Sequence, residues 1–262
     1  MPIPIMNTPT PVVFLGAGPG DPELITLKGR RLLDEADVIV YAGSLVNPAL
    51  LTGVEAEMYD SAGMTLDEVL AVLIATAQAG KKAVRLHTGD PALYGAIREQ
   101  MQRLTAQNIP YEVVPGVSSA LAAAAALQTE LTVPEVTQTV IFTRQAGRTP
   151  VPEQESLRKL AAIQASLCIF LSVSMIDTVV DELIAGGYPQ ETPIAVVKKA
   201  SWPDQHIVQG TLVNIADRVK ASAIRKTAMI VVGRALSDDS TAASKLYDAG
   251  FCHEYRTGKQ AV

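Results

Sequence analysis

Short apolar runs alternate with helix-length segments through the first half of the chain, and this alternation limits the fold more than any other feature. The runs typical of strands lie at residues 11–16, 37–42, 81–90 and 111–116, the third of them ending in a turn. Segments with the length and periodicity of helices lie between them at 22–36, 65–80 and 91–107. Because strands joined through helices pair in parallel with right-handed crossovers, this half predicts a parallel sheet.

The helix expected at residues 65–80 carries the clearest boundary signals. Thr65 followed by Glu68 makes a capping box, in which each residue bonds the backbone N–H of the other. Gly80 is expected to end this helix.

The alternation of strand-type runs with helical segments stops at residues 128–138, where Pro134 interrupts the helical pattern. The later strand candidates, which lie closer together, are residues 139–144, 167–173, 192–200, 206–212 and 228–236. Their spacing favours a mixed sheet. We therefore predict an N-terminal domain at residues 1–130, a C-terminal domain at 131–236 and a partly ordered tail at 237–262.

Composition narrows the class of protein. The chain is 48% hydrophobic and 19% charged, which favours an α/β fold with buried sheets. Its formal charge of −5 provides no overall positive potential to attract nucleic acid, which disfavours a nucleic-acid-binding protein. Cys168 and Cys252 form no recognisable zinc or disulfide pattern, so we expect no metal and a reducing compartment. With no signal peptide and no membrane span, the sequence predicts a soluble, cytoplasmic protein.

The turn "GAGPGDP" at residues 16–22 raises the question of its ligand. Its spacing is G-x-G-x-G, whereas dinucleotide-binding turns have G-x-G-x-x-G. Pro19 and Pro22 have no N–H to offer a phosphate, and no acidic residue ends the second strand, which closes with Tyr41 and Ala42. The turn therefore argues against a dinucleotide, while Asp21 can cap a following helix.

Two further turns have a similar make-up. "HTGDPALYG" begins at His87 and contains Gly89 and Asp90, and "VPGVSSALA" begins at Val114 and contains Gly116. All three turns follow predicted parallel strands, at the edge where open α/β sheets bind ligands. Together they predict a binding site.

These motifs, in this order and spacing, resemble the tetrapyrrole methylases that use S-adenosylmethionine. The resemblance rests on "GAGPGDPELITLKGRRLLDEADVIVYAGSLV", the "GDP" at Gly89–Pro91 and "VPGVSS", and it extends from about Val12 to Leu236. It implies an α/β fold of two αβα domains with the cofactor in the cleft between them, in a homodimer.

Several stretches are similar to one branch of the family, the precorrin-4 C(11)-methyltransferases of cobalamin biosynthesis. They include "YAGSLVNPALL", "HTGDPALYGAIREQM" and "KKASWPDQHIVQGTL". The uroporphyrinogen branch typically has an aspartate, assigned as a proton acceptor, where this chain has Ala42. The resemblance implies methylation of precorrin-4 at C(11) to give precorrin-5 and S-adenosylhomocysteine. Another precorrin, cobalt-precorrin-4, a protein or RNA acceptor, and a non-catalytic sensor remain alternatives.

Carried over position by position, the family's cofactor contacts fall on all three turns and on the second domain. They are Pro19, Thr88, Gly89, Asp90, Leu93, Ser118, Ser119, Ser172, Ala200, Thr227 and Ala228. No residue is assigned as the base that removes the proton.

The macrocycle carries many carboxylates, which suit arginine forks. Arg144 and Arg148, four residues apart in a loop, are the preferred substrate-binding pair. His87 could accept a proton or bind a propionate, or be structural, and Tyr94 could face the substrate or the core. Trp202 could line the pocket or pack. The other cations expected near the cleft, each of which could be a solvated surface charge, are Arg85, Arg98, Lys198 and Lys199.

Overall fold

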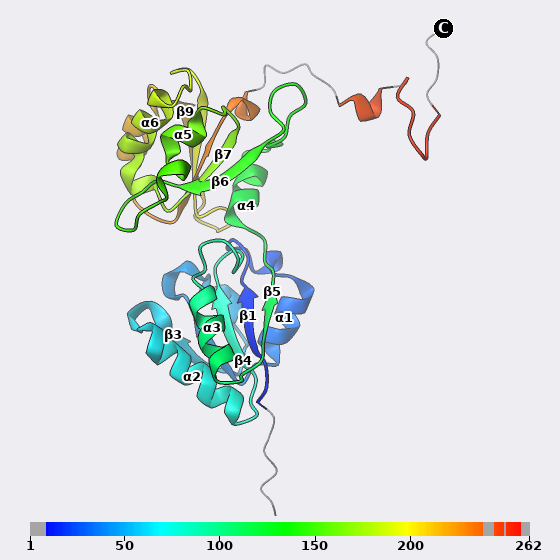
Figure 1. Cartoon of the computed structure of the whole chain (residues 1–262), viewed down its shortest axis with the longest axis vertical. Helices are drawn as coiled ribbons and strands as arrows, with labels where there is room; N and C mark the ends of the chain where they lie inside the picture. The colour runs from blue at the N-terminus through cyan, green and yellow to red at the C-terminus, as the bar shows by residue number, and fades with distance from the viewer. Residues whose placement is uncertain (1–8, 238–243, 249, 258–262) are drawn as a thin grey trace, which may run out of the picture. The chain divides into compact units, whose positions relative to one another are not determined.

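The computed structural model describes residues 9–237, 244–248 and 250–257. Within them the chain forms two compact units, both visible in Figure 1. The N-terminal unit runs to Ala122 and also contains Lys199–Gln205, whereas the C-terminal unit contains Ala123–Lys198 and the chain from His206 onward. The predicted division into residues 1–130, 131–236 and 237–262 ends its first domain slightly later and stays a prediction.

A parallel sheet forms the centre of the N-terminal unit, as predicted, and it has five strands rather than the four expected. Its strand order is β3-β2-β4-β1-β5. The strands are β1 (Val12–Gly16), β2 (Val38–Tyr41), β3 (Glu57–Asp60), β4 (Ala83–His87) and β5 (Tyr111–Val114). Gly16 pairs with His87, and Leu15 with Val114, so the carboxyl ends of β1, β4 and β5 meet at one edge. The three turns singled out in the sequence all leave from this edge.

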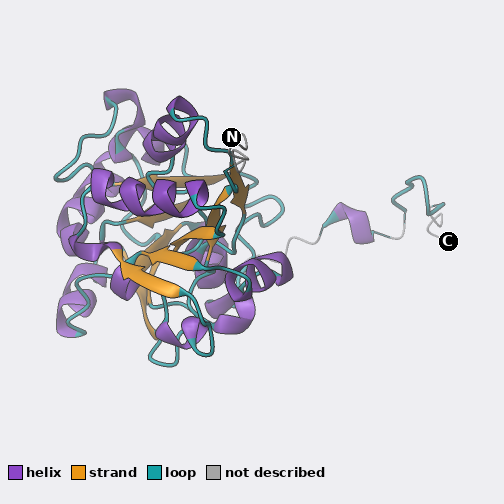
Figure 2. Ribbon diagram, turned by 90° about the horizontal axis from the view of Figure 1, so that it is seen from below, coloured by secondary structure: helices purple, strands orange, loops and turns teal. Residues whose placement is uncertain are grey.

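Helices cover both faces of this sheet (Figure 2). They are α1 (Leu27–Asp34), α2 (Leu66–Gln78) and α3 (Arg98–Ala106). A fourth helix, α4 (Ser119–Ala126), leads out of the unit. Phe14 and Val40 pack with Leu73 of α2 and Leu104 of α3 on one face. Leu15, Ile39 and Leu86 face the other way and pack with Leu33 of α1. This two-sided core follows from the alternation of side chains along each strand.

The capping box of α2 is confirmed, because the Thr65 and Glu68 side chains each accept from the other's backbone N–H. The helix expected at residues 22–36 is split instead. Asp21 caps a 3-10 turn at Pro22–Leu24, and α1 begins only after Thr26, whose hydroxyl accepts from Gly29 N.

The helix predicted at residues 91–107 is also shorter than expected, since α3 begins at Arg98. Tyr94 and Ala96 have φ angles of 57° and 49°, in the left-handed region. Between them, a Cβ on Gly95 would lie 2.2 Å from the Pro91 carbonyl oxygen. Tyr94 therefore stands in a tight turn before the helix, and the prediction that placed it inside the helix was wrong.

A mixed sheet forms the C-terminal unit, as predicted, in the order β6-β7-β10-β8-β9. The strands are β6 (Val140–Arg144), β7 (Ser166–Phe170), β8 (Pro193–Lys198), β9 (His206–Thr211) and β10 (Ala228–Val232). β6 and β7 are parallel, and the other pairs are antiparallel. α5 (Leu157–Ala161), α6 (Ile176–Ala185) and α7 (Ile215–Ala221) pack on the face that carries Ile169, Val196 and Ile230.

Short 3-10 turns complete the elements. They are η1 (Pro22–Leu24), η2 (Gly43–Leu45), η3 (Pro48–Leu51), η4 (Ser61–Gly63), η5 (Glu153–Glu155), η6 (Val173–Met175), η7 (Arg234–Leu236) and η8 (Lys245–Tyr247). Of the predicted tail, the described part contains η8 and an isolated bridge between His253 and Arg256, and its other residues lie outside the described ranges. No helix in the described ranges is long and apolar enough to cross a membrane.

Gly16→Ala is expected to destabilise the N-terminal unit, because the new Cβ would lie 2.6 Å from the Gly116 Cα and 2.7 Å from the Gly89 carbonyl oxygen. Both are backbone atoms, so relief requires a backbone shift, and the expected loss is roughly 2 kcal/mol or more of unfolding free energy. Urea denaturation measures it. Gly63→Ala is the matched control, since a Cβ there meets nothing within 4 Å. Equal stability of the two variants would contradict the proposed backbone contact.

Candidate functional site

The first and second turns are joined by backbone hydrogen bonds. Gly18 N donates to Gly89 O at 3.2 Å, and Gly89 N donates to Gly18 O at 2.8 Å. Ala17 N also donates to His87 O at 2.7 Å. The parallel pairing of β1 with β4 therefore ends in a reciprocal bridge between two glycines, both at positive φ.

The third turn is held to the second by Asp90 and by close backbone packing. The carboxylate of Asp90 accepts from Gly116 N at 2.9 Å through Oδ2 and from Ala92 N at 2.8 Å through Oδ1. A Cβ on Gly116 would lie only 2.2 Å from Gly89 O. The structure thus brings all three turns together, and the Asp90 side chain is occupied in fixing them.

The remaining predicted residues of these turns differ in burial. Thr88 is exposed and Leu93 is half-buried. Ser118 is buried, and its hydroxyl accepts from Ala120 N at 3.3 Å at the start of α4, where Ser119 is the first helical residue. The main chain and small side chains therefore form most of this edge of the sheet.

Trp202 packs against the first turn, and a role in lining the pocket stays a prediction. Its indole Nε1 donates to Pro19 O at 2.9 Å, and a Cβ on Gly20 would lie 1.9 Å from its ring. The neighbouring Ser201 hydroxyl accepts from Asp21 N at 3.0 Å. Sequence reasoning missed this role of Ser201, because no motif signals a contact 180 residues away.

Lys199 and Ala200 belong to the same segment. The ammonium of Lys199 lies 4.7 Å from the centroid of the Trp202 ring and bonds Asp204 at 2.7 Å, while Ala200 is buried. The charge of Lys199 is therefore already paired within its own loop.

In the C-terminal unit, strand register brings the other predicted residues to one end of the mixed sheet. Ala228 pairs with Lys198, and Arg144 pairs with Phe170, two residues before Ser172. Ile169 pairs with Ile230, which places the end of β7 beside the start of β10. Thr227, Ala228 and Ser172 therefore lie at the same end of the sheet as Arg144.

The hydroxyl of Ser172 is fully buried and already bonded on both sides. It accepts from Gln145 N at 2.8 Å and donates to Phe170 O at 2.6 Å. Any contact of Ser172 with a ligand is therefore expected through its main chain.

The two arginines of the loop after β6 have different surroundings. Arg144 donates to Thr149 O at 3.1 Å and to Pro150 O at 2.6 Å, so its guanidinium folds the loop back on itself. Arg148 is exposed and makes no hydrogen bond or ion pair with any residue that the structure describes. As substrate contacts, both arginines remain predictions.

His87 is buried and has an unpartnered ring nitrogen, Nε2. Burial, with a smaller effect of the nearby Arg85 charge, lowers the pKa of His87 to about 3. The imidazole is therefore neutral at physiological pH. Tyr94, by contrast, is 44% exposed.

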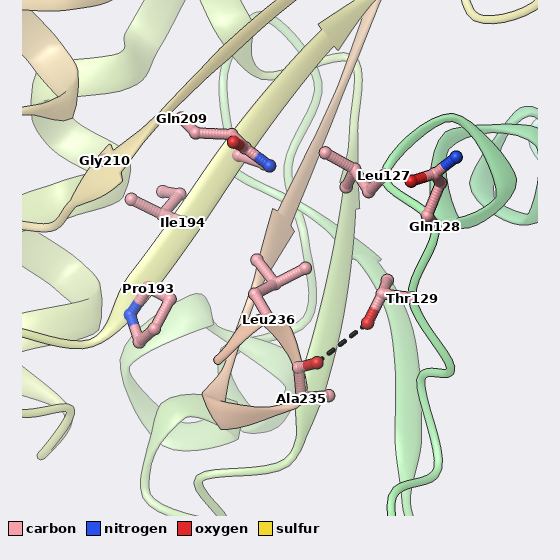
Figure 3. Close-up of a pocket in the computed structure, with 10 residues that line it drawn as sticks. Leu127, Gln128, Thr129, Pro193, Ile194, Gln209, Gly210, Ala235 and Leu236 are labelled. Atoms are coloured by element: carbon pink, nitrogen blue, oxygen red, sulfur yellow. Dashed lines mark hydrogen bonds between the residues drawn. The ribbon is translucent and has the colours of Figure 1, made fainter. Parts of the chain in front are cut away.

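A pocket of about 350 Å³ lies at the Pro193 end of β8, away from the end that carries Lys198 (Figure 3). It is lined by residues such as Gln128, Pro193 and Gln209, and Thr129 Oγ1 donates to Ala235 O at 2.8 Å beside it. At about 3.3 Å per residue, Pro193 lies roughly 16 Å along the strand from Lys198. The pocket includes none of the predicted site residues.

The neutral state of His87 predicts a stability that depends on pH. Its folded-state pKa of about 3 lies below the ordinary value of 6.5, so the unfolded chain binds the proton first as pH falls. Its contribution to stability is complete above pH 6.5 and declines toward pH 3. The expected loss by pH 4.5 is about 3 kcal/mol in wild type relative to His87→Gln. Urea unfolding across this range measures it, with the exposed His206→Gln as control; identical curves for wild type and His87→Gln would refute the neutral state.

Comparison with known proteins places the chain in a family. The family model described as Tetrapyrrole (Corrin/Porphyrin) Methylases matches residues 11–216. The cobalt-precorrin-4 C(11)-methyltransferase of Methanocaldococcus jannaschii is 57% identical over 96% of this chain and 98% of its own length. The precorrin-4 C(11)-methyltransferase of Pseudomonas aeruginosa is 48% identical over 95% and 99%.

A solved structure shares the fold. The uroporphyrin-III C-methyltransferase of Thermus thermophilus, complexed with S-adenosylhomocysteine, superimposes with a TM-score of 0.74 at 29% identity. The alignment covers 87% of this chain and 93% of that one. The match extends over both units, in agreement with the predicted α/β fold. The chain therefore belongs to the tetrapyrrole methylase family.

Proposed function

We propose that this protein transfers the methyl group of S-adenosylmethionine to C(11) of precorrin-4, in cobalamin biosynthesis. The observation that carries the proposal is the set of three interlocked glycine turns, in a chain 57% and 48% identical to two enzymes named for this reaction. The cofactor becomes S-adenosylhomocysteine, and the methylated ring loses one proton to give precorrin-5.

The chemistry of the turns fits a cofactor without phosphates. Pro19 and Pro22 carry no N–H, and among the described residues no cationic side chain donates into the three turns. The main chain around Gly18, Gly89 and Gly116 is closely packed and offers small side chains at its edge. When bound, S-adenosylmethionine supplies a methyl group already activated on its sulfonium.

The chain's own contribution is positioning. Holding two reactants in line can lower a barrier by up to about 7 to 11 kcal/mol. For the cofactor we infer contacts on the three turns, the Lys199–Gln205 segment and one end of the mixed sheet. The residues are Pro19, Thr88, Gly89, Asp90, Leu93, Ser118, Ser119, Ser172, Ala200, Thr227 and Ala228.

For the substrate, the unpaired guanidinium of Arg148 is the better candidate of the loop pair, since Arg144 is engaged with Thr149 and Pro150. His87 and Tyr94 are the other proposed substrate-binding residues. Arg144 then acts by holding the loop that presents Arg148.

Cobalt-precorrin-4 is the second candidate substrate, because the 57% identical relative is named for it and the 48% identical one for precorrin-4. Family resemblance also supports a homodimer in the cytoplasm. The net charge of −5 supports an acceptor other than nucleic acid.

The function is tested by incubating the purified protein with S-adenosylmethionine and either precorrin-4 or cobalt-precorrin-4. We expect one methyl group to be added at C(11) of at least one of them, identified by mass spectrometry and by NMR with a 13C-labelled methyl donor. If the protein binds S-adenosylhomocysteine but methylates neither substrate, the proposed acceptor is refuted. If it does not bind S-adenosylhomocysteine, the proposed cofactor is refuted.

Asp90→Ala is expected to weaken S-adenosylhomocysteine binding at least tenfold, or about 1.4 kcal/mol. The reason is that the variant frees Gly116 N and Ala92 N and so releases the third turn from the second. Isothermal titration calorimetry measures the affinity. Asp181→Ala is the control, since Asp181 is exposed on α6 and makes no hydrogen bond or ion pair with the described residues. Unchanged binding by Asp90→Ala would contradict the role given to the turns.

A further inference from the structure

Two polar side chains lie on one face of β4, just before the second turn. Arg85 and His87 are two residues apart, so both point to the face that packs against α2 and α3. Arg85 is largely buried, and His87 is 5% exposed. Such side chains in a sheet interior normally have partners, because burying an unpaired polar group is costly.

The guanidinium of Arg85 is bonded on one side only. Its Nη1 donates to Val40 O at 3.2 Å and to Ser61 Oγ at 3.0 Å. Its Nε is buried without a partner, and Nη2 makes no hydrogen bond with the residues that the structure describes. The Nε and Nη2 groups form the edge with which arginine holds a carboxylate through two parallel hydrogen bonds.

Among the described residues, no carboxylate forms an ion pair with Arg85. Burial alone lowers the pKa of Arg85 to about 10, whereas a nearby carboxylate would raise it. Asp60, the neighbour in sequence of Ser61, caps η4 by accepting from Ala62 N. A largely buried cation with an unpaired Nε–Nη2 edge, and with no counter-ion among the described residues, is suited to an anionic ligand.

His87 adds a second polar group on the same face. Its Nε2 is buried and unpartnered, as Nε of Arg85 is. A neutral imidazole can donate through one ring nitrogen, which complements a carboxylate oxygen without adding a competing acid. His87 is the last residue of β4 and the first of the second turn, so the pair adjoins the proposed cofactor contacts.

We propose that the Nε–Nη2 edge of Arg85, assisted by His87, binds a carboxylate of the tetrapyrrole substrate. This inference rests on the proposed function, and it makes Arg85 a substrate-binding residue in addition to Arg148. The cofactor also has a carboxylate, on its methionyl part, so the experiment separates the two sources.

The test compares wild type with Arg85→Lys and Arg85→Gln. Lysine keeps the charge and loses the two-pronged edge, and glutamine loses both. Steady-state methylation is expected to show KM for the tetrapyrrole raised at least tenfold in both variants, with kcat changed far less. Calorimetry is expected to show unchanged S-adenosylhomocysteine affinity. Arg103→Gln, a surface arginine paired with Asp67, is the control.

Two further measurements keep the outcomes distinct. Absorbance titration with uroporphyrin, and with its carboxyl methyl ester, measures binding without methyl transfer; only the free acid is expected to bind wild type, and Arg85→Gln is expected to weaken it. Ser61→Ala removes a structural contact of Arg85 and leaves the carboxylate edge, so its KM is expected to stay near wild type.

Unchanged tetrapyrrole KM and uroporphyrin affinity in folded Arg85→Gln would overturn the proposal. So would a loss of S-adenosylhomocysteine affinity, which would assign the edge to the cofactor. Failure of the wild type to methylate, with uroporphyrin binding still dependent on Arg85, would overturn the proposed function and leave the carboxylate site supported.

Discussion

The contact on which the rest of the N-terminal unit depends is the meeting of three glycine backbones at the carboxyl edge of its sheet. Gly16, Gly89 and Gly116 approach so closely that a single methyl group on one would enter the backbone of another. The Asp90 carboxylate closes this arrangement by accepting from Gly116 N. Because side chains are excluded here, the edge can offer a ligand only main chain and small neighbouring groups, and specificity has to come from residues around it.

Much of this could be predicted from sequence, because the signals are local. Apolar alternation located β1, β2, β4 and β5, and glycine spacing located the turns that join them to the helices. β3 (Glu57–Asp60) was missed, since its residues are mostly exposed and it is stabilised by pairing with β2 at the sheet edge rather than by an apolar pattern. The helix predicted from residue 91 begins only at Arg98, for the opposite reason. Its local sequence favours a helix, but Tyr94 and Ala96 adopt left-handed conformations that a helix cannot contain.

The residues of the candidate site also fall into those that local sequence signals reveal and those that depend on the folded structure. Asp90 and the glycines stood out because turn chemistry requires those residue types. The roles of Ser172 and Arg144 did not, since they depend on carbonyl groups that only the folded loop presents. Both side chains are bonded to the backbone, so the proposed ligand contact of Ser172 falls on its main chain, and that of the arginine loop falls on Arg148. Long-range packing, such as that of Trp202 on Pro19, has no counterpart in the sequence pattern.

The Lys199–Gln205 segment gives the N-terminal unit a discontinuous chain, since it lies between β8 and β9 in sequence and yet belongs to the first unit. During synthesis, the first 122 residues emerge without Trp202 or Ser201, so Pro19 O and Asp21 N then lack the partners that they have in the complete fold. The first turn can be completed only after most of the second unit has been translated. A gene fragment that ends at the boundary after Ala122 would therefore encode an N-terminal unit that lacks the hydrogen bonds of Trp202 and Ser201 to the first turn.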